Sequence, residues 1–310
     1  PGAGGRWRIH RGMKIETLRG KVAVITGAGS GFGREFARIA AEEGMSLVLV
    51  DVQADALAET VAGLDGIDIL HRTLDVTDGV AMEALAADAF TRFGAVHLLF
   101  NNAGVGCTGL LWEATTRDWE WVLGVNLWGT IHGVRAFVPR MLANAKADPA
   151  YRGRVINTAS MAGLIDPPLM GPYNVAKHAV VSLSETLHQD LSLVTDQIGC
   201  SVLCPSWVAT GIAKSHRNRP HDDPTRSRAA ALGASMVEKA IASAKVTADD
   251  VARLTFDAIA HDRFWVLPHP QAVEGVRERA DALLSGGAPA DPYAAIPQVR
   301  QQLAAALRAS

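Results

Sequence analysis

The chain has 310 residues and a mass of 32.8 kDa, which is enough to bury one large α/β core. Its net charge of −2 and pI of about 6.6 provide no basic surface for nucleic acid or for an anionic membrane. The three cysteines and ten histidines show no disulfide or metal-ligand spacing, no apolar run approaches the ~20 residues that span a bilayer, and no signal-peptide core precedes the fold, so we expect a cytoplasmic protein without a metal.

Short runs rich in Val, Ile and Leu alternate with longer alanine-rich helical stretches, after a Gly- and Arg-rich leader over residues 1–12 that we exclude from the fold. This alternation predicts a single α/β domain over residues 13–270, with parallel strands joined by crossover helices. A helical extension is expected over residues 271–310, with helices near 272–284 and 297–307. The strands are expected near Val22, Leu47, Ile69, Leu98, Val155, Val202 and Val266.

The first strand leads directly into a glycine-rich turn. Residues 21–26 are apolar, Gly27-x-x-x-Gly31-x-Gly33 follows at once, and residues 34–43 have helical periodicity. Glycines let the backbone approach a pyrophosphate, and the following helix directs free N–H groups at the phosphates. The spacing matches neither the strict dinucleotide fingerprint nor the phosphate-loop lysine motif, and a tight structural connection would use the same glycines.

A second strand, over residues 46–50, ends in Asp51. A carboxylate at this position can accept hydrogen bonds from the adenosine ribose hydroxyls. Its charge would repel the 2′-phosphate of NADP, and neither Ser30 nor Val52 supplies a basic side chain that could pair with this phosphate. The sequence therefore favours NAD over NADP.

Tyr173 and Lys177 lie four residues apart in a helical stretch, and Ser160 lies thirteen positions before Tyr173. Helical spacing puts the phenol and the ammonium on one face. The ammonium is expected to lower the pKa of the phenol from its ordinary value of about 10. If the fold brings Ser160 beside the phenol, its hydroxyl can hold a substrate oxygen. The Tyr-x-x-x-Lys spacing is only suggestive alone and depends on this context.

These motifs occur in the order and approximate spacing of the short-chain dehydrogenase/reductase family, which the chain resembles over about residues 20–268. The resemblance implies one Rossmann-like, doubly wound, mainly parallel seven-stranded sheet with helices on both faces and the ligands above its carboxyl edge. The elements that carry it are Thr26-Gly27-x-x-x-Gly31-x-Gly33, Asp75-Val76, Asn102-Ala103-Gly104, Asn126, Ser160 and Tyr173-x-x-x-Lys177.

The resemblance also implies a role for each matched residue. Tyr173 would be the catalytic acid/base, Lys177 would lower its pKa and bind the nicotinamide ribose, and Ser160 would hold the substrate oxygen. Asn126 would anchor a water that links Lys177 to solvent. Ser206 departs from the glycine usual in the family, which leaves the conformation of the loop over residues 205–210 open. The cofactor would be bound by the turn and the strand ends: Gly27, Ser30, Gly31, Phe32, Gly33, Asp51, Val52, Asp75, Val76, Asn102, Ala103, Gly104, Tyr173, Lys177, Pro205, Val208 and Thr210.

Some of these positions have competing structural interpretations. Asn126 could be a satisfied buried amide, and Asp75 could cap the helix that begins near Asp78. Four tryptophans, at 112, 119, 121 and 128, are interpreted as core and subunit contacts rather than as a ligand cage. A cluster of arginines alternates with aspartates and prolines and is interpreted as a solvated loop: Arg217, Arg219, Arg226 and Arg228.

The loops expected around the substrate, residues 105–112 and 161–170, are mostly apolar. This favours a hydrophobic or alicyclic alcohol or ketone over a phosphorylated sugar. Leu164, Met170 and Trp207 are the candidate wall residues, and each is also compatible with plain packing. The stretch 211–246 is predicted to be either a lid that closes on substrate or a static excursion, and the final helix is expected to dock on a neighbouring subunit.

From these features we expect an NAD-dependent oxidoreductase that interconverts a secondary alcohol and a ketone, by tyrosine acid/base catalysis with hydride transfer to nicotinamide. The partner would be a small-molecule substrate, and the assembly a homodimer or homotetramer, as the resemblance implies. An NADPH-dependent ketoreductase or epimerase, and a catalytically silent cofactor-binding regulatory protein, are the alternatives. The sequence has no Gly-x-Ser-x-Gly elbow, which disfavours a serine hydrolase.

Overall fold

A computed structural model of the chain describes residues 18–220, 227–294 and 296–309, so the predicted leader over residues 1–12 lies outside the described residues. Within them, seven strands form one parallel sheet in the order β3-β2-β1-β4-β5-β6-β7. The predicted doubly wound parallel sheet is confirmed. Its strands are β1 (Val22–Thr26), β2 (Ser46–Asp51), β3 (Ile69–Thr73), β4 (Leu98–Asn101), β5 (Gly153–Thr158), β6 (Ile198–Leu203) and β7 (Trp265–Val266).

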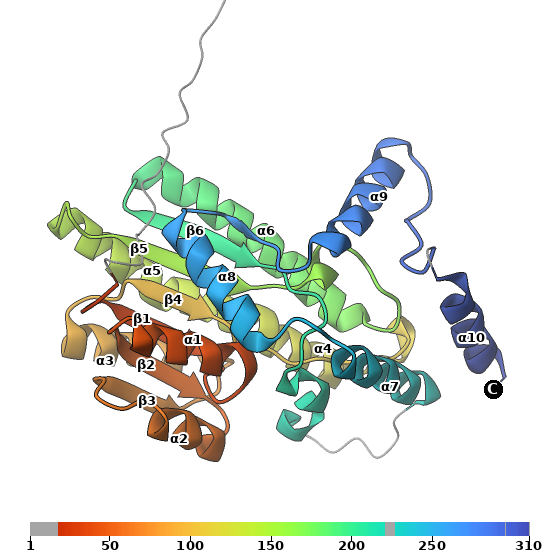
Figure 1. Cartoon of the computed structure of the whole chain (residues 1–310), viewed down its shortest axis with the longest axis horizontal. Coiled ribbons are helices and arrows are strands. Elements are labelled where there is room, and N and C mark those ends of the chain that lie inside the picture. The colour runs from red at the N-terminus through yellow and green to blue at the C-terminus, as the bar shows by residue number, and fades with distance from the viewer. Residues whose placement is uncertain (1–17, 221–226, 295, 310) are drawn as a thin grey trace, which may run out of the picture.

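Helices cover both faces of the sheet (Figure 1). On one face α1 (Gly31–Glu42) packs against α8 (Ala248–Ala260), and Phe36 stacks on Phe100 with ring centroids 4.7 Å apart. On the other face α3 (Gly79–Phe93), α5 (Gly129–Ala147) and α6 (Gly171–Val194) contribute Met82, Phe137 and Leu191 to a second buried cluster. Because both faces are covered, the central strands consist almost entirely of buried residues, as their continuous apolar runs predict.

Short polar signals begin several of the helices. Asp78 caps α3 by accepting hydrogen bonds from the backbone N–H groups of Val80 and Ala81. The interpretation of Asp75 as the cap of this helix is therefore wrong, because Asp75 accepts instead from the N–H of Thr77 within its own turn. The helix α4 (Thr116–Leu123) begins with a capping box formed by Thr115 and Asp118.

The order of the strands reverses at the centre of the sheet, where β1 lies between β2 and β4. In open α/β sheets, ligands bind outside the carboxyl ends of the strands at such a switch point. Gly27, Asp51, Asn102 and Ser160 all lie at or just beyond the carboxyl ends of strands. The fold therefore brings motifs that are far apart in the sequence to one edge of the sheet.

The chain after β6 forms several helices beside this edge. They are the 3-10 segment Gly211–Asn218 (η5), α7 (Arg228–Ala242), α9 (Val273–Leu284) and α10 (Pro297–Arg308). Earlier in the chain, α2 (Ala54–Ala62) connects β2 to β3. In α10, Leu303 is buried in a cluster with Leu169 and Ala229 of the same chain. The cluster shows that α7 and the turn before α6 supply apolar partners for α10 within the chain, and the docking of this helix on a neighbouring subunit stays a prediction.

Candidate active site

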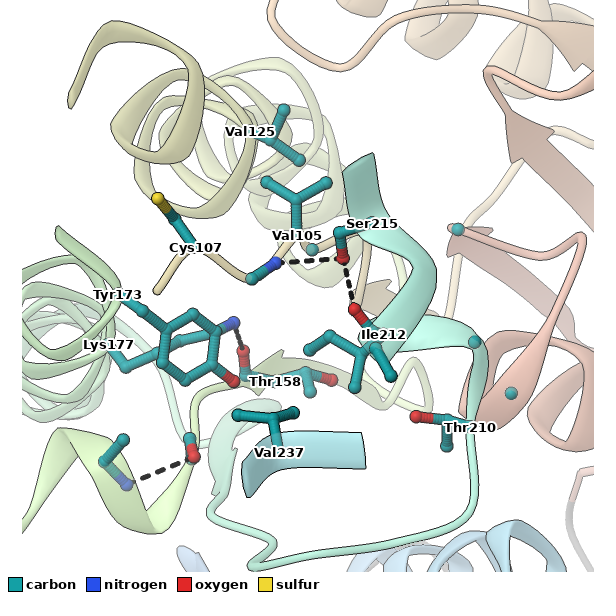
Figure 2. Close-up of a pocket in the computed structure, with 18 of the residues that line it drawn as sticks. Val105, Cys107, Val125, Thr158, Tyr173, Lys177, Thr210, Ile212, Ser215 and Val237 are labelled. Carbon is teal, nitrogen blue, oxygen red and sulfur yellow. Dashed lines mark hydrogen bonds between the residues drawn. The ribbon is translucent and has the colours of Figure 1, made fainter. Parts of the chain in front are cut away.

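A cavity of about 480 Å³ lies at the carboxyl edge of the sheet. Its lining comes from the strand ends, from the starts of α1 and α6, from α7 and from residues near the C-terminus. In Figure 2, Tyr173 and Lys177 extend from α6 toward Thr158 at the end of β5. Three of the predicted catalytic residues, Ser160, Tyr173 and Lys177, and most of the predicted cofactor residues therefore face one continuous space.

The glycine turn at one end of the cavity permits contacts that side chains would block. Gly27 and Gly31 have φ values of +69° and +53°, in the left-handed region that favours glycine. A Cβ atom on Gly33 would lie 2.0 Å from the carbonyl oxygen of Gly27. Ser30 precedes α1 without making a side-chain capping bond, so N–H groups of the first helical turn remain available to an anion. The turn fits a phosphate, with Gly33 packing behind it rather than lining the cavity.

Asp51 stands at the end of β2 on the same side of the cavity. Its two carboxylate oxygens accept hydrogen bonds from the N–H groups of Gly29, at 2.8 Å, and Gln53, at 2.9 Å. Val52 beside it is 49% exposed and offers no charge. The guanidinium of Arg34 donates to the carbonyl of Gly29 at 2.7 Å and pairs with Glu59 on the surface. The carboxylate of Asp51 is therefore held in place by two backbone N–H groups, and its role in binding a ribose stays a prediction.

Thr26 organises the next part of the lining from the end of β1. Its Oγ1 accepts from the N–H groups of Asn102, at 2.9 Å, and Ala103, at 3.0 Å. The Asn102 side chain donates to the Thr26 carbonyl at 3.0 Å and accepts from the Thr158 hydroxyl at 3.2 Å. These bonds hold the segment after β4 along the middle of the cavity. The predicted cofactor residues Ser30, Gly31, Phe32, Asp75, Val76, Asn102, Ala103 and Gly104 all line it.

Ser160, Tyr173 and Lys177 come together at the other end, and each is at most 9% exposed. Tyr173 is hydrogen-bonded to Ser160, whose Oγ also accepts from the N–H of Ala162 at 3.1 Å. The Nζ of Lys177 donates to the carbonyl of Thr158 at 2.8 Å and lies 5.7 Å from the centre of the Tyr173 ring. The three side chains thus have the arrangement that a proton-transfer site requires.

The pKa values of the buried pair differ from the expectation. Burial raises the pKa of Tyr173 to about 12, and its hydrogen bond with Ser160 opposes this shift only in part. Burial also lowers the pKa of Lys177 to about 8. The expectation that the ammonium lowers the pKa of the phenol is therefore wrong for the protein by itself, because removal from water disfavours the charged form of each group.

Asn126 lies in a π-helical turn, Gly124–Trp128, between α4 and α5. Its side chain accepts from the N–H of Val105 and donates to the Val105 carbonyl, each at 2.8 Å. A Cβ atom on Gly104 would lie 3.0 Å from Asn126 Oδ1 and 3.5 Å from Lys177 Nζ. Asn126 is therefore a satisfied buried amide, separated from Lys177 by a glycine, and it does not itself line the cavity. Its role in anchoring a water stays a prediction.

Comparison with known proteins decides the family. Residues 21–221 match the family model for short chain dehydrogenases. A short chain dehydrogenase/reductase from Burkholderia phymatum, solved in complex with NAD, is 48% identical, with a TM-score of 0.85 over 89% of this chain and 98% of that one. The chain belongs to the short-chain dehydrogenase/reductase family.

Two curated relatives are similar over most of their lengths. The CLA biosynthesis dehydrogenase/reductase of Lactiplantibacillus plantarum is 34% identical over 89% of this chain and 97% of the relative. The C alpha-dehydrogenase of a Sphingobium species is 31% identical over 94% of each chain. As a short-chain dehydrogenase/reductase, the chain is a member of an oxidoreductase family.

The loop after β6 accommodates its departure from the family pattern. Ser206 replaces the usual glycine, but among the described non-glycine residues only Leu169 and Asp262 have positive φ, so no left-handed backbone is required at Ser206. The N–H of Ser206 donates to Nδ1 of His269 at 3.1 Å. The predicted nicotinamide-loop residues that line the cavity are Pro205, Val208 and Thr210.

Two of the three predicted wall residues line the cavity of this dehydrogenase/reductase, namely Met170 and Trp207. Leu164 does not, which corrects that prediction. It packs against the buried cluster that contains Val180 and Val181, because the 3-10 turn Met161–Gly163 directs the chain back onto α6. Position along the loop was therefore a poor guide to which apolar side chain faces the cavity.

Residues 210–220, which we call the strap, include the start of the stretch that was predicted to be either a lid or a static excursion, and that choice stays open. The sequence did not indicate which of these residues line the cavity or how they are held. The Ser215 hydroxyl of the strap accepts from the N–H of Gly106 at 3.0 Å (Figure 2). Arg219 forms an ion pair with the buried Asp118 and lies 5.7 Å from the centre of the Trp121 ring. The interpretation of Arg219 as part of a solvated loop is wrong, and Trp121 lines the cavity as well as packing in the core. Arg226 lies outside the described residues.

A second missed contribution comes from the C-terminal extension. Pro292, Tyr293 and Ile296 line the cavity, although they lie far beyond the residues that match the family model. Tyr293 packs in the same cluster as Leu303 of α10 and Leu169 next to Met170. The extension therefore completes the wall at the end of the cavity near α6.

Metal-binding and membrane-spanning features are not found in the described ranges 18–220, 227–294 and 296–309. No group of three or more His, Cys, Asp or Glu side chains there could hold a metal ion. No helix in this part of the chain is both long and apolar enough to cross a membrane. Cys200 and Cys204 are buried, and burial raises the pKa of each thiol to about 12, as expected for core residues.

Proposed function

We propose that this chain is an NAD-dependent dehydrogenase that interconverts a secondary alcohol and a ketone. The observation that carries the proposal is the presence of Ser160, Tyr173 and Lys177 on a cavity that also contains the glycine turn and Asp51. The NAD bound by the Burkholderia relative, at 48% identity, supports the same cofactor for this chain.

The residues of the cavity fit a dinucleotide along its whole length. The backbone around Ser30 and Gly31 would hold the phosphates, since a Cβ atom at Gly33 would collide with the turn and the helix N–H groups are available. Asp51 would accept from the adenosine ribose, and Asp75 and Val76 lie where the adenine would rest. The half-buried carboxylate of Asp51 favours NAD because it would repel a 2′-phosphate.

The bound dinucleotide would supply the hydride acceptor for oxidation and the hydride donor for reduction. In oxidation the Tyr173 oxygen takes the proton of the alcohol, and in reduction it returns a proton to the ketone oxygen. Ser160, hydrogen-bonded to Tyr173, holds the substrate oxygen beside it. While it is protonated, Lys177 would offset part of the cost that burial imposes on the Tyr173 phenolate, and its bond to the Thr158 carbonyl holds the ammonium 5.7 Å from the centre of the ring.

The substrate end of the cavity favours an uncharged, hydrophobic or alicyclic molecule. Met170 and Trp207 line the cavity together with Val237 and Ile241 of α7 and with side chains of the C-terminal extension. The basic side chains in the described lining are Lys177, His216 and Arg217, of which the last two belong to the strap. An anionic substrate would therefore find no cation on the apolar wall.

A panel of cyclic, aromatic and aliphatic secondary alcohols tests the proposal, with NAD or NADP and the absorbance of reduced cofactor as the signal. Tyr173→Phe should lower turnover by at least about a hundredfold and leave the Kd of NADH near wild type. Tyr151→Phe is the matched control, because Tyr151 is buried outside the cavity and donates to the Val96 carbonyl. Normal turnover by Tyr173→Phe would refute the assignment of the acid/base.

We further propose that the protein is a homodimer or homotetramer through the outer faces of α5 and α6. A shallow groove there is lined by Val134 of α5 and by Ala179, Leu183 and Leu187 of α6. The leucine and valine side chains of this groove are partly exposed, and a second copy of the chain would bury them further. Light scattering on a size-exclusion column tests the assembly, and Leu183→Glu should shift it toward the monomer. A wild-type protein that elutes as a monomer at micromolar concentration would refute it.

A further inference from the structure

The strap crosses directly over the glycine turn. A Cβ atom on Gly31 would lie 3.2 Å from Cβ of Thr210, and one on Gly211 would lie 3.6 Å from Oγ of Ser30. Asn218, near the other end of the strap, accepts from Nε2 of Gln53 at 2.6 Å. The strap is therefore fastened over the part of the cavity that fits the phosphates and the adenosine ribose.

The guanidinium of Arg217 lies beside Gly211, the strap residue that approaches Ser30 of the turn. The same Cβ position on Gly211 would lie 3.1 Å from Nη2 and 3.4 Å from Nη1 of Arg217. Arg217 lines the cavity together with Ser30 and Gly31. No hydrogen bond or ion pair joins its side chain to another residue in the described part of the chain. By contrast, Arg219 is paired with Asp118.

The charges around the glycine turn indicate that a bound pyrophosphate would need a cationic partner, which Arg217 can supply. A pyrophosphate carries two negative charges, while Asp51 and Asp75 make the described lining near it acidic. The turn itself supplies backbone N–H groups but no cation, since Arg34 is engaged by Gly29 and Glu59. A guanidinium donates paired hydrogen bonds that match phosphate oxygens.

We propose that Arg217 binds the pyrophosphate of the dinucleotide and so couples the strap to cofactor binding. The proposal rests on the proposed function only in requiring a dinucleotide. It does not require a particular alcohol substrate. A 2′-phosphate on the adenosine ribose is a less suitable partner for Arg217 than the pyrophosphate. Near Asp51 the strap contacts Gln53 through the neutral side chain of Asn218, so this contact brings no positive charge to that side of the cavity.

The test measures binding rather than turnover. The Kd of NADH is determined by fluorescence, and those of ADP-ribose, adenosine and NADPH by calorimetry, for the wild type and for Arg217→Ala, Arg217→Lys and Lys214→Ala. Lys214 is the matched control, because it is an exposed cation of the same strap that does not line the cavity. Thermal unfolding of each variant is recorded, and no change is expected because Arg217 has an exposed side chain.

Arg217→Ala should raise the Kd of NADH and of ADP-ribose about tenfold and leave that of adenosine unchanged. The salt dependence of NADH binding should weaken in the same variant, and Arg217→Lys should recover part of the affinity. A Kd within twofold of wild type for Arg217→Ala, an equal loss in Lys214→Ala, or a loss confined to NADPH would each overturn the proposal. Absence of alcohol turnover in a protein that binds NADH would refute the proposed function and leave this result intact.

Discussion

Replacement of Asp51 by asparagine tests the electrostatic basis of cofactor choice. The two oxygens of Asp51 hold the N–H groups of Gly29 and Gln53, so alanine would remove both acceptors together with the charge. Asparagine keeps the shape and one acceptor. A loss of about 1 kcal/mol in the free energy of unfolding is expected from the remaining N–H group.

The size of the effect follows from the position of the carboxylate. Two unit charges about 4 Å apart repel by about 4 kcal/mol at an effective dielectric constant of about 20. Asp51 is only half-buried and its neighbour Val52 is 49% exposed, so water screens part of this repulsion. A remainder of about 1–2 kcal/mol corresponds to about a 5- to 30-fold change in the preference for NAD over NADP.

The assay compares kcat/KM for NAD and NADP in the wild type and in Asp51→Asn at low and high salt. The preference should narrow in the variant, and the difference should shrink as salt is added. Asp55→Asn is the matched control, since Asp55 is an exposed carboxylate in the first turn of α2 that does not line the cavity. An unchanged ratio in Asp51→Asn, or an equal change in Asp55→Asn, would contradict the reasoning.

Three further predictions concern proton transfer, the substrate wall and acid stability. Burial raises the pKa of Tyr173 to about 12 and lowers that of Lys177 to about 8. We therefore expect kcat/KM for ketone reduction to stay constant from about pH 6 to 8 and to fall above about pH 8, where Lys177 loses its proton. A pH profile without this fall would contradict the assignment of the two residues. Tyr293→Ala should shift the ratio of kcat/KM values for bulky over small alcohols about tenfold upward by opening the wall, whereas Leu284→Ala, on the exposed side of α9, should not change the ratio. Burial lowers the pKa of His97 to about 4, from about 6.5 in the unfolded chain, so between these pH values only the unfolded state binds the proton. The free energy of unfolding should therefore drop by about 3 kcal/mol as the pH falls from about 6.5 to about 4. Urea unfolding of His97→Gln should show that most of this drop has disappeared.

The parts of the fold and site that the sequence predicted correctly depend on neighbouring residues in the chain. The strands are recognisable in the sequence as continuous apolar runs because a parallel sheet is buried on both faces. The glycine turn joins β1 to α1 without a gap, and the spacing of Tyr173 and Lys177 is one helical turn. In each case the pattern is contained in a few consecutive residues, so no knowledge of the tertiary packing is needed to read it.

The proximity of the Lys177 ammonium to the Tyr173 phenol was predictable from the sequence, but the burial of these two groups was not. The helical spacing correctly brought Lys177 near the Tyr173 ring, at 5.7 Å. The direction of the pKa shift depends instead on how completely the rest of the chain covers the phenol, which is 7% exposed. A pairwise argument from sequence counts the attraction and omits the cost of removing both charges from water.

The substrate wall shows where sequence patterns stop being informative. The apolar positions of α10 predict a helix, but nothing local says that Leu303 packs with Leu169 or that Tyr293 reaches the cavity. These contacts join the C-terminal extension to the turn before α6, across a stretch that the family model does not cover. The catalytic residues are thus recognisable from short motifs, whereas the residues of the extension reach the cavity only through long-range packing. We expect this packing to influence the choice of substrate, and the Tyr293→Ala measurement tests that expectation directly.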